Sequence, residues 1–163
     1  MILLKPEPLT RTGFAAFGDV VETEAAKHYA INQGFAERFN DLANVDVSSE
    51  GGSVNTSIVV AKPRPFPIAL ELMERHPLGS QIFHPLQDRP WLVAVCGDPR
   101  DLPSFRLFLA TGLQGINYGR NVWHHPLLVL DANSRFMVVD RKGPGKNLEE
   151  IRLEQQVFCG SNT

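Results

Sequence analysis

The sequence has few of the features that mark membrane, secreted or nucleic-acid-binding proteins. No apolar run approaches the roughly 20 residues that a membrane helix needs, and the N-terminus lacks the apolar stretch of a signal peptide. Only two cysteines occur, Cys96 and Cys159, and they form no CxxC pair. Cys96 lies in an apolar run, where a buried free thiol is the ordinary interpretation. We therefore expect a cytoplasmic protein without a membrane contact.

No block of like charges is present either. Sixteen basic and eighteen acidic side chains give a formal net charge of -2, which is unlike the basic footprint of a nucleic-acid-binding domain. A small-molecule substrate is the more reasonable partner, and no nucleic acid is expected.

Helical periodicity is also scarce. The clearest candidate covers residues 11–17, between a Thr10 cap and Gly18, and it is too short to organise a helical fold. A chain of 163 residues can bury roughly two thirds of its unfolded surface as one compact domain. We expect a single domain over residues 1–163.

What the sequence does contain is a series of short extended runs separated by turn formers. The runs cover residues 54–61, 68–76, 81–86, 91–96, 105–110, 126–130 and 136–140. Twelve prolines and thirteen glycines lie mostly at the breaks, and residues 48–53 are typical of a hairpin connection. The pattern predicts a mainly β fold, an antiparallel barrel or sandwich with a few short helices. Residues 160–163 are expected to be a disordered tail.

Two segments, residues 74–81 and 121–126, carry most of the candidate chemistry. Three of the five histidines precede proline, namely His76, His84 and His125. A residue before proline is pushed towards extended geometry, so these imidazoles are expected at strand ends, where binding sites are often built.

Strand alternation sorts the side chains of the first segment. Glu74 and His76 should share one face, so that Glu74 could orient His76, whereas Arg75 points to the other face. After the turn, Gln81 and His84 should face opposite ways. His76 and Gln81 are therefore the candidates that this segment contributes to a site.

The same alternation applies to the second segment. His124 should share a face with Val122, whereas Trp123 and His125 face the other way. Two adjacent histidines in a strand cannot both enter one pocket, so His124 is the candidate and His125 is not.

These residue types permit more than one chemistry. Two neutral imidazoles can act as a general acid and a general base, or they can bind a divalent metal. Arg120 or Arg141 could hold a substrate carboxylate with two parallel hydrogen bonds, although a solvated surface role is equally ordinary. Tyr118 suits either ligand contact or packing.

The sequence resembles the ureidoglycolate lyase family, formerly called ureidoglycolate hydrolase. The resemblance rests on residues 74–81, 114–118 and 121–126, and it extends to residues 14–23, 31–34 and 139–141. It implies a cupin-like β-barrel, usually a homodimer. The implied reaction is the cleavage of (S)-ureidoglycolate to glyoxylate and urea in allantoin and purine breakdown.

The resemblance also implies how the site would be occupied. In metal cupins a histidine precedes a glutamate by five positions, and here His76 precedes Gln81 by five. His76, Gln81 and His124 would therefore hold a divalent metal such as nickel, although a neutral amide is a weaker ligand than a carboxylate. Without a metal, His76 and His124 would act as acid and base.

The substrate suggests the remaining assignments. Arg120 is the first choice for its carboxylate, with Arg141 and Tyr118 as further contacts, and Gln81 and Asn121 could hydrogen-bond its ureido group. The chain departs from the family pattern at Gly119 and Asn40, where histidine is common, and at Val60, where arginine is common. A metal-dependent cupin enzyme acting on another small carboxylic acid and a non-catalytic small-acid-binding cupin remain as alternatives.

Overall fold

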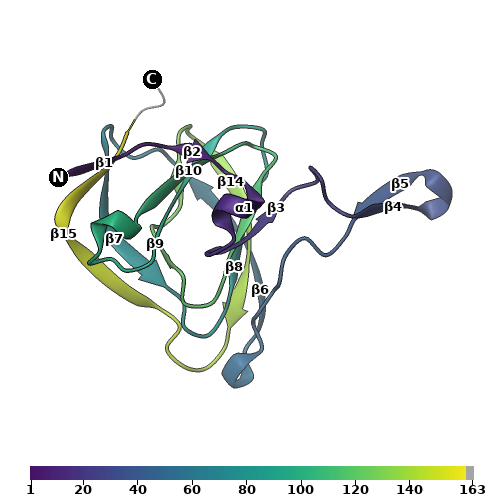
Figure 1. The fold of residues 1–163 in the computed structure, drawn as a ribbon. Coiled ribbons are helices and arrows are strands. Elements are labelled where there is room, and N and C mark those ends of the chain that lie inside the picture. The colour runs from purple at the N-terminus through teal and green to yellow at the C-terminus, as the bar shows by residue number, and fades with distance from the viewer. Residues whose placement is uncertain (161–163) are drawn as a thin grey trace.

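Two β-sheets lie face to face in the computed structural model, which describes residues 1–160 (Figure 1). Sheet A has the strand order β1-β15-β7-β12-β9-β10-β2, with β13 also paired to β9, and sheet B has the order β3-β11-β8-β14-β6. The strands of sheet A are β1 (Ile2–Leu4), β2 (Glu7–Pro8), β7 (Ile68–Arg75), β9 (Trp91–Cys96), β10 (Arg106–Ala110), β12 (Trp123–His124), β13 (Leu128–Val129) and β15 (Glu149–Cys159). Those of sheet B are β3 (Gly18–Val21), β6 (Ser53–Ala61), β8 (Gln81–Pro85), β11 (Gly115–Tyr118) and β14 (Ser134–Lys142).

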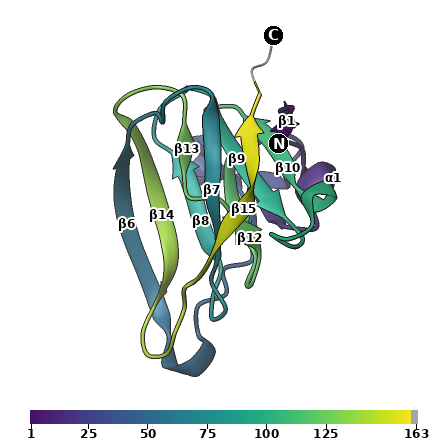
Figure 2. The ribbon, with the colours of Figure 1, turned by 90° about the vertical axis from the view of Figure 1, so that its left-hand side faces the viewer.

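The expected fold class, a mainly β barrel or sandwich with a few short helices, is confirmed. Most strand pairs are antiparallel, and the two parallel pairs in residues 1–160 join the short strands β1 and β2 to sheet A. In Figure 2, β6 and β14 run side by side along one flank, and β1 and the last residues of β15 lie at the end of the barrel opposite the β14–β15 turn.

Helices are few and short. They are α1 (Arg11–Phe14) and the single 3-10 turns η1 (Asn32–Gly34), η2 (Ser49–Gly51) and η3 (Leu102–Ser104). The Thr10 side chain accepts a hydrogen bond from the Gly13 backbone N–H, as the cap predicted, but α1 ends at Phe14 rather than at residue 17. No helix in residues 1–160 is long and apolar enough to cross a membrane.

Two local expectations were wrong or incomplete. Residues 48–53 do not connect a hairpin: they contain η2 and lead into β6, whose partner is the distant strand β14. Strand β15, the longest strand, was not predicted either, because its exposed positions are rich in Glu and Gln. The tail was expected to be disordered from residue 160, but the Gly160 N–H donates to the Leu4 carbonyl at 2.7 Å. The rest of that expectation concerns residues 161–163, which lie outside the described residues.

Strand β9 shows how the core is divided. All six of its residues are buried, which matches its unbroken apolar sequence because a strand covered on both faces needs no polar alternation. Trp91, Val93 and Val95 pack between the two sheets. Leu92, Ala94 and Cys96 pack on the other face of sheet A, beneath β1 and β15. Sheet A is therefore held rigidly from both sides.

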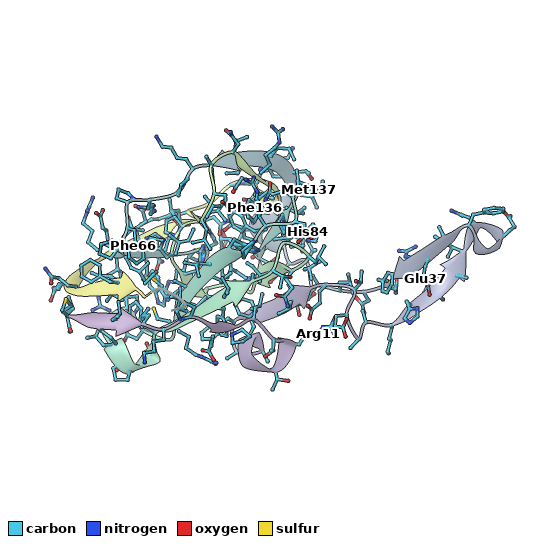
Figure 3. The ribbon with its side chains drawn as sticks, turned by 90° about the horizontal axis from the view of Figure 1, so that it is seen from above. Arg11, Glu37, Phe66, His84, Phe136 and Met137 are labelled. Atoms are coloured by element: carbon cyan, nitrogen blue, oxygen red, sulfur yellow. The ribbon has the colours of Figure 1, made fainter. Side chains whose placement is uncertain are left out.

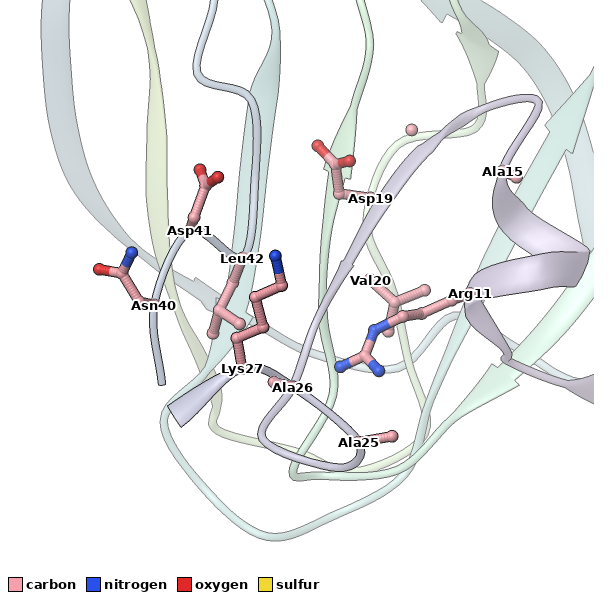
Figure 4. A pocket seen from close by; sticks show the side chains of 11 residues that line it. Arg11, Ala15, Asp19, Val20, Ala25, Ala26, Lys27, Asn40, Asp41 and Leu42 are labelled. Carbon is pink, nitrogen blue, oxygen red and sulfur yellow. The ribbon is translucent and has the colours of Figure 1, made fainter. Parts of the chain in front are cut away.

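A hairpin formed by β4 (His28–Ile31) and β5 (Ala36–Phe39) projects away from the two sheets as an arm (Figures 1 and 3). Phe35 at its tip is 91% exposed and Tyr29 is 49% exposed. Where the arm leaves the barrel, a cavity of about 510 Å³ is lined by both polar and apolar side chains, including Arg11, Lys27 and Asp41 (Figure 4).

Candidate functional site

His76 follows directly after the last residue of β7, as the His-Pro sequence predicts. Its Nδ1–H donates to the Asn147 carbonyl oxygen at 2.8 Å, and its own carbonyl accepts from the Asn121 N–H at 3.0 Å. The Asn147 side chain also accepts from the Leu78 N–H at 2.7 Å. These bonds fix the ring, and because Nδ1 carries the proton, Nε2 of the neutral ring offers a lone pair.

His124 lies in the middle of sheet A. Its strand β12 pairs with β7 on one side and β9 on the other, which places His124 opposite Glu74 and Val95. The residue is 1% exposed, its Nδ1–H donates to the Val122 carbonyl at 2.9 Å, and the Tyr118 ring stacks on it at a centroid distance of 4.0 Å. Its Nε2 therefore also offers a lone pair.

The two segments converge. The rings of His76 and His124 are 5.2 Å apart between centroids, and Nε2 of His124 is 3.4 Å from Oε1 of Glu74. One ligand atom from each of these three residues lies within 4.8 Å of the others. We call Glu74, His76 and His124 the carboxylate–imidazole cluster. It lies on the face of sheet A that is turned towards sheet B.

The cluster is rich in lone pairs and poor in protons. Nε2 of His76 and Nε2 of His124 are both buried, and neither has a hydrogen-bond partner within residues 1–160. Burial alone would raise the pKa of Glu74, but the nearby His124 and His76 imidazoles lower it below its ordinary value. Three converging acceptors repel one another unless a positive charge lies between them, and the cluster could hold a proton or a metal cation.

Sheet B contributes amide groups to the facing wall. Gln81 is the cross-strand partner of Tyr118, so both side chains leave the sheet on the same face. The Gln81 Nε2 donates to Oδ2 of Asp140 at 3.2 Å, whereas its Oε1 is buried and has no partner in the described part of the chain. Like the cluster, this amide presents an unused acceptor.

Arg120 is exposed to solvent and already has an anionic partner. Its guanidinium donates to both carboxylate oxygens of Asp46, at 3.0 and 2.8 Å, and this contact raises its pKa. Asn121, next to it, is exposed and has a left-handed backbone with φ of 63°. Their roles as substrate-binding residues stay predictions.

Arg141 is buried and is engaged by backbone groups. It donates to the carbonyl oxygens of Ser49, Glu50 and Pro144, at distances between 2.7 and 3.3 Å. It therefore braces η2 against the turn that follows β14, and its role in substrate binding also stays a prediction.

His125 and His84 lie outside the cluster. His125 is buried, its Nδ1–H donates to the Pro126 carbonyl at 2.8 Å, and burial lowers its pKa to about 4. His84 borders a surface cavity together with Leu42 and Leu113, and burial lowers its pKa.

The sequence did not reveal what Glu74 contacts. Alternation placed it on the same face as His76, but its close contact is with His124, because the register of β12 against β7 pairs those two residues. Asp140 was missed altogether. Its signal was weak, since one Asp in an alternating strand is ordinarily a solvated residue.

The three departures from the family pattern lie in different places. A Cβ at Gly119 would lie 3.7 Å from its nearest neighbours, so the backbone leaves room for a side chain there. Asn40 lines the cavity at the base of the arm (Figure 4). Val60 is 57% exposed on β6.

Comparison with known proteins gives consistent results. A family model described as ureidoglycolate lyase matches residues 1–159. The chain is 54% identical to ureidoglycolate lyase 1 of Rhizobium meliloti (strain 1021), over 94% of this chain and 91% of the relative. It is 49% identical to ureidoglycolate lyase of Burkholderia mallei (strain NCTC 10229), over 97% and 94%.

Similarity to solved structures is more distant. A dTDP sugar isomerase from Desulfovibrio desulfuricans G20 is 16% identical with a TM-score of 0.44, covering 84% of this chain and 85% of that one. Oxalate decarboxylase of Bacillus subtilis is 14% identical with a TM-score of 0.37, covering 68% and 30%.

Proposed function

Because this chain belongs to the ureidoglycolate lyase family, we propose that it cleaves ureidoglycolate to glyoxylate and urea at the carboxylate–imidazole cluster. The observation that carries the proposal is the convergence of two imidazoles and one carboxylate. One ligand atom of each lies within 4.8 Å of the others, and both buried imidazole Nε2 atoms have no hydrogen-bond partner in residues 1–160. An acid–base reaction on a small substrate needs such a set of groups.

The substrate is a carbinolamine: one carbon carries a hydroxyl group, a carboxylate and a ureido nitrogen. Removal of the hydroxyl proton lets the C–O bond become the aldehyde C=O, while the C–N bond breaks and its electron pair goes to nitrogen. Protonation of that nitrogen releases urea. No water is consumed, so the reaction is an elimination.

The contacts of the cluster suggest how the two histidines divide the work. Glu74 is 3.4 Å from Nε2 of His124 and would stabilise the imidazolium that forms when His124 takes the hydroxyl proton. His76, protonated at Nε2, would then give a proton to the leaving nitrogen. After product release, the proton on His124 moves to His76 within the cluster, which restores the starting protonation state.

The same donor set fits a divalent metal such as nickel. Imidazole nitrogens and a carboxylate oxygen are common ligands of divalent ions, and His76, His124 and Glu74 would hold the ion, with Gln81 as the ligand expected from sequence. When bound, such an ion supplies Lewis-acid polarisation of the substrate hydroxyl group. The test is the metal content of the purified protein and of Glu74→Gln, measured by mass spectrometry. The unmodified protein should contain one ion per chain, and Glu74→Gln should contain less.

Binding groups surround the cluster. The buried Oε1 of Gln81 would accept from a ureido N–H, and Arg120 at the rim would attract the substrate carboxylate. Asn121 donates its backbone N–H to the carbonyl of His76, so its side chain begins next to the cluster.

The direct test is an assay of the purified protein with racemic ureidoglycolate, with and without added nickel or manganese. Glyoxylate and urea should appear in equal amounts from one enantiomer. If neither product appears under any of these conditions, the lyase assignment is wrong.

We further propose that the protein works as a homodimer in the cytoplasm. Exposed aromatic side chains on the arm, and exposed Ile58, Val60 and Met137 on one face of β6 and β14, are apolar surfaces that a second copy would cover. Both cysteines are free and buried, which suits a reducing compartment.

A further inference from the structure

Three polar side chains form a chain of hydrogen bonds along sheet B, beside the cluster. Asp140 of β14 is the cross-strand partner of Asn55 on β6, and it lies one position beyond the pair formed by Val139 and Ile82 on its other side. Asn55 Nδ2 donates to Oδ1 of Asp140 at 3.0 Å, and Gln81 Nε2 donates to Oδ2 at 3.2 Å. Each carboxylate oxygen thus accepts from one amide.

This arrangement determines which way the Gln81 amide faces. A carboxylate accepts hydrogen bonds and has none to donate, so the NH₂ group of Gln81 must point at Asp140. The amide oxygen then has to point away. Asn55 holds the other carboxylate oxygen, which prevents Asp140 from rotating to release Gln81.

The oxygen that points away is Oε1, which is buried without a hydrogen-bond partner in residues 1–160. Leaving a buried acceptor unpaired costs free energy, so such an atom is retained where a ligand supplies the donor. Its position fits: Gln81 pairs across strands with Tyr118, and the Tyr118 ring stacks directly on His124. The inner face of sheet B therefore carries a bare acceptor next to the residue that contacts the catalytic histidine.

We propose that Asp140, held by Asn55, is a positioning residue that fixes Gln81 as an acceptor-only subsite for the N–H groups of the ureido moiety. The proposal rests on the proposed lyase function and deepens it. A ligand with N–H donors, such as urea, gains a hydrogen bond here. A ligand that presents only acceptor oxygen atoms, such as the unhydrated aldehyde form of glyoxylate, gains nothing.

The test compares inhibition of the lyase reaction by its two products. Asp140→Asn keeps the shape of the side chain but leaves one acceptor atom for two amide donors, so Gln81 is free to flip. Gln81→Met removes the acceptor at similar length. In both variants the inhibition constant of urea should rise about tenfold, as expected for one lost hydrogen bond, and that of glyoxylate should stay within about twofold.

The double variant separates positioning from independent contacts. If Asp140 acts through Gln81, then Asp140→Asn combined with Gln81→Met should weaken urea inhibition no more than Gln81→Met alone. Asp88→Asn, an exposed carboxylate after β8, is the matched control and should change neither constant. Asn55→Ala removes the other amide that holds Asp140, and it should weaken urea inhibition by a smaller factor.

Two results would overturn the proposal: urea and glyoxylate inhibition weakening by the same factor, or urea inhibition unchanged in Asp140→Asn and Asn55→Ala. Thermal unfolding of each variant shows whether it is folded, and if Asp140→Asn does not fold, Asn55→Ala decides. Failure of the lyase function itself is a separate result, because it would show as no product release by the unmodified protein.

Discussion

The two sheets meet at one site but bring different chemistry to it. Sheet A supplies groups that exchange protons or bind a cation, namely Glu74, His76 and His124. Sheet B supplies amides whose orientation is fixed by hydrogen bonds, Gln81 and Asn55 on either side of Asp140. Under the proposed function, reaction and recognition are divided between the two walls of the barrel.

The mechanical setting of the walls differs as well. Strand β9, which pairs with the strand of His124, is buried on both faces, whereas β6 of sheet B alternates between exposed and half-buried residues. Reacting groups must keep their geometry to within fractions of an ångström, and the doubly covered sheet holds them. A sheet whose residues only bind the substrate can tolerate an outer face that is exposed to solvent.

The strongest test of this division is removal of His124. His124→Ala should lower kcat by roughly 10²- to 10⁴-fold, the usual contribution of a general acid or base. Steady-state assays of glyoxylate release measure the effect. His84→Ala, a histidine of sheet B outside the cluster, should keep kcat within about threefold of the unmodified protein; equal losses in the two variants would contradict the assignment.

Substitution of Glu74 should have the next largest effect on activity. Glu74→Gln preserves shape but removes the negative charge 3.4 Å from His124, and losing one charge-assisted contact in the transition state should lower kcat about 10- to 100-fold. The control is Glu71→Gln, an exposed position on the same strand. A change in KM alone would instead place Glu74 among the binding groups.

Arg120 should affect binding more than turnover. Arg120→Ala should raise KM about tenfold with little change in kcat if the guanidinium meets the substrate carboxylate. Asp46→Asn keeps Arg120 but weakens their contact, so it distinguishes two roles. If Arg120 merely braces the loop at Asp46, both variants should have the same KM; if it binds substrate, only Arg120→Ala should raise KM.

The arm should have the smallest effect on chemistry. Phe35→Ser and Tyr29→Ser together should shift the protein from dimer to monomer in light-scattering measurements at equal concentration, because both side chains are exposed on the arm. kcat should stay within about twofold. Leu148→Ser, also an exposed apolar position, is the control, and an unmodified protein that is already monomeric would rule the dimer out.

Local patterns predicted a large part of this fold. The runs at residues 68–76, 81–86 and 91–96 appear as β7, β8 and β9 with ends within one residue. Strand β12 was not predicted, because two residues are too few to show alternation. Strand β15 was not predicted either: Ile151, Leu153, Val157 and Cys159 alternate, but Gln155 interrupts the pattern. Their pairing energy comes from neighbours that are distant in the sequence.

The candidate site divides in the same way. Alternation correctly separated His124 from His125 and Gln81 from His84, since side chains alternate strictly along a strand. Gln81 and Asp140 lie 59 positions apart in the sequence and share a hydrogen bond. Nothing in either segment could indicate that contact.

The sequence by itself determined the fold class, the strand faces and the family, because these follow from the period of a strand and from motifs that are local. Only the tertiary structure decided that Glu74 contacts His124, that Arg141 braces backbone carbonyls, and that Asp140 orients Gln81. The physical reason is register: side-chain contacts between strands depend on how distant segments align, and a shift of one residue would reverse every face.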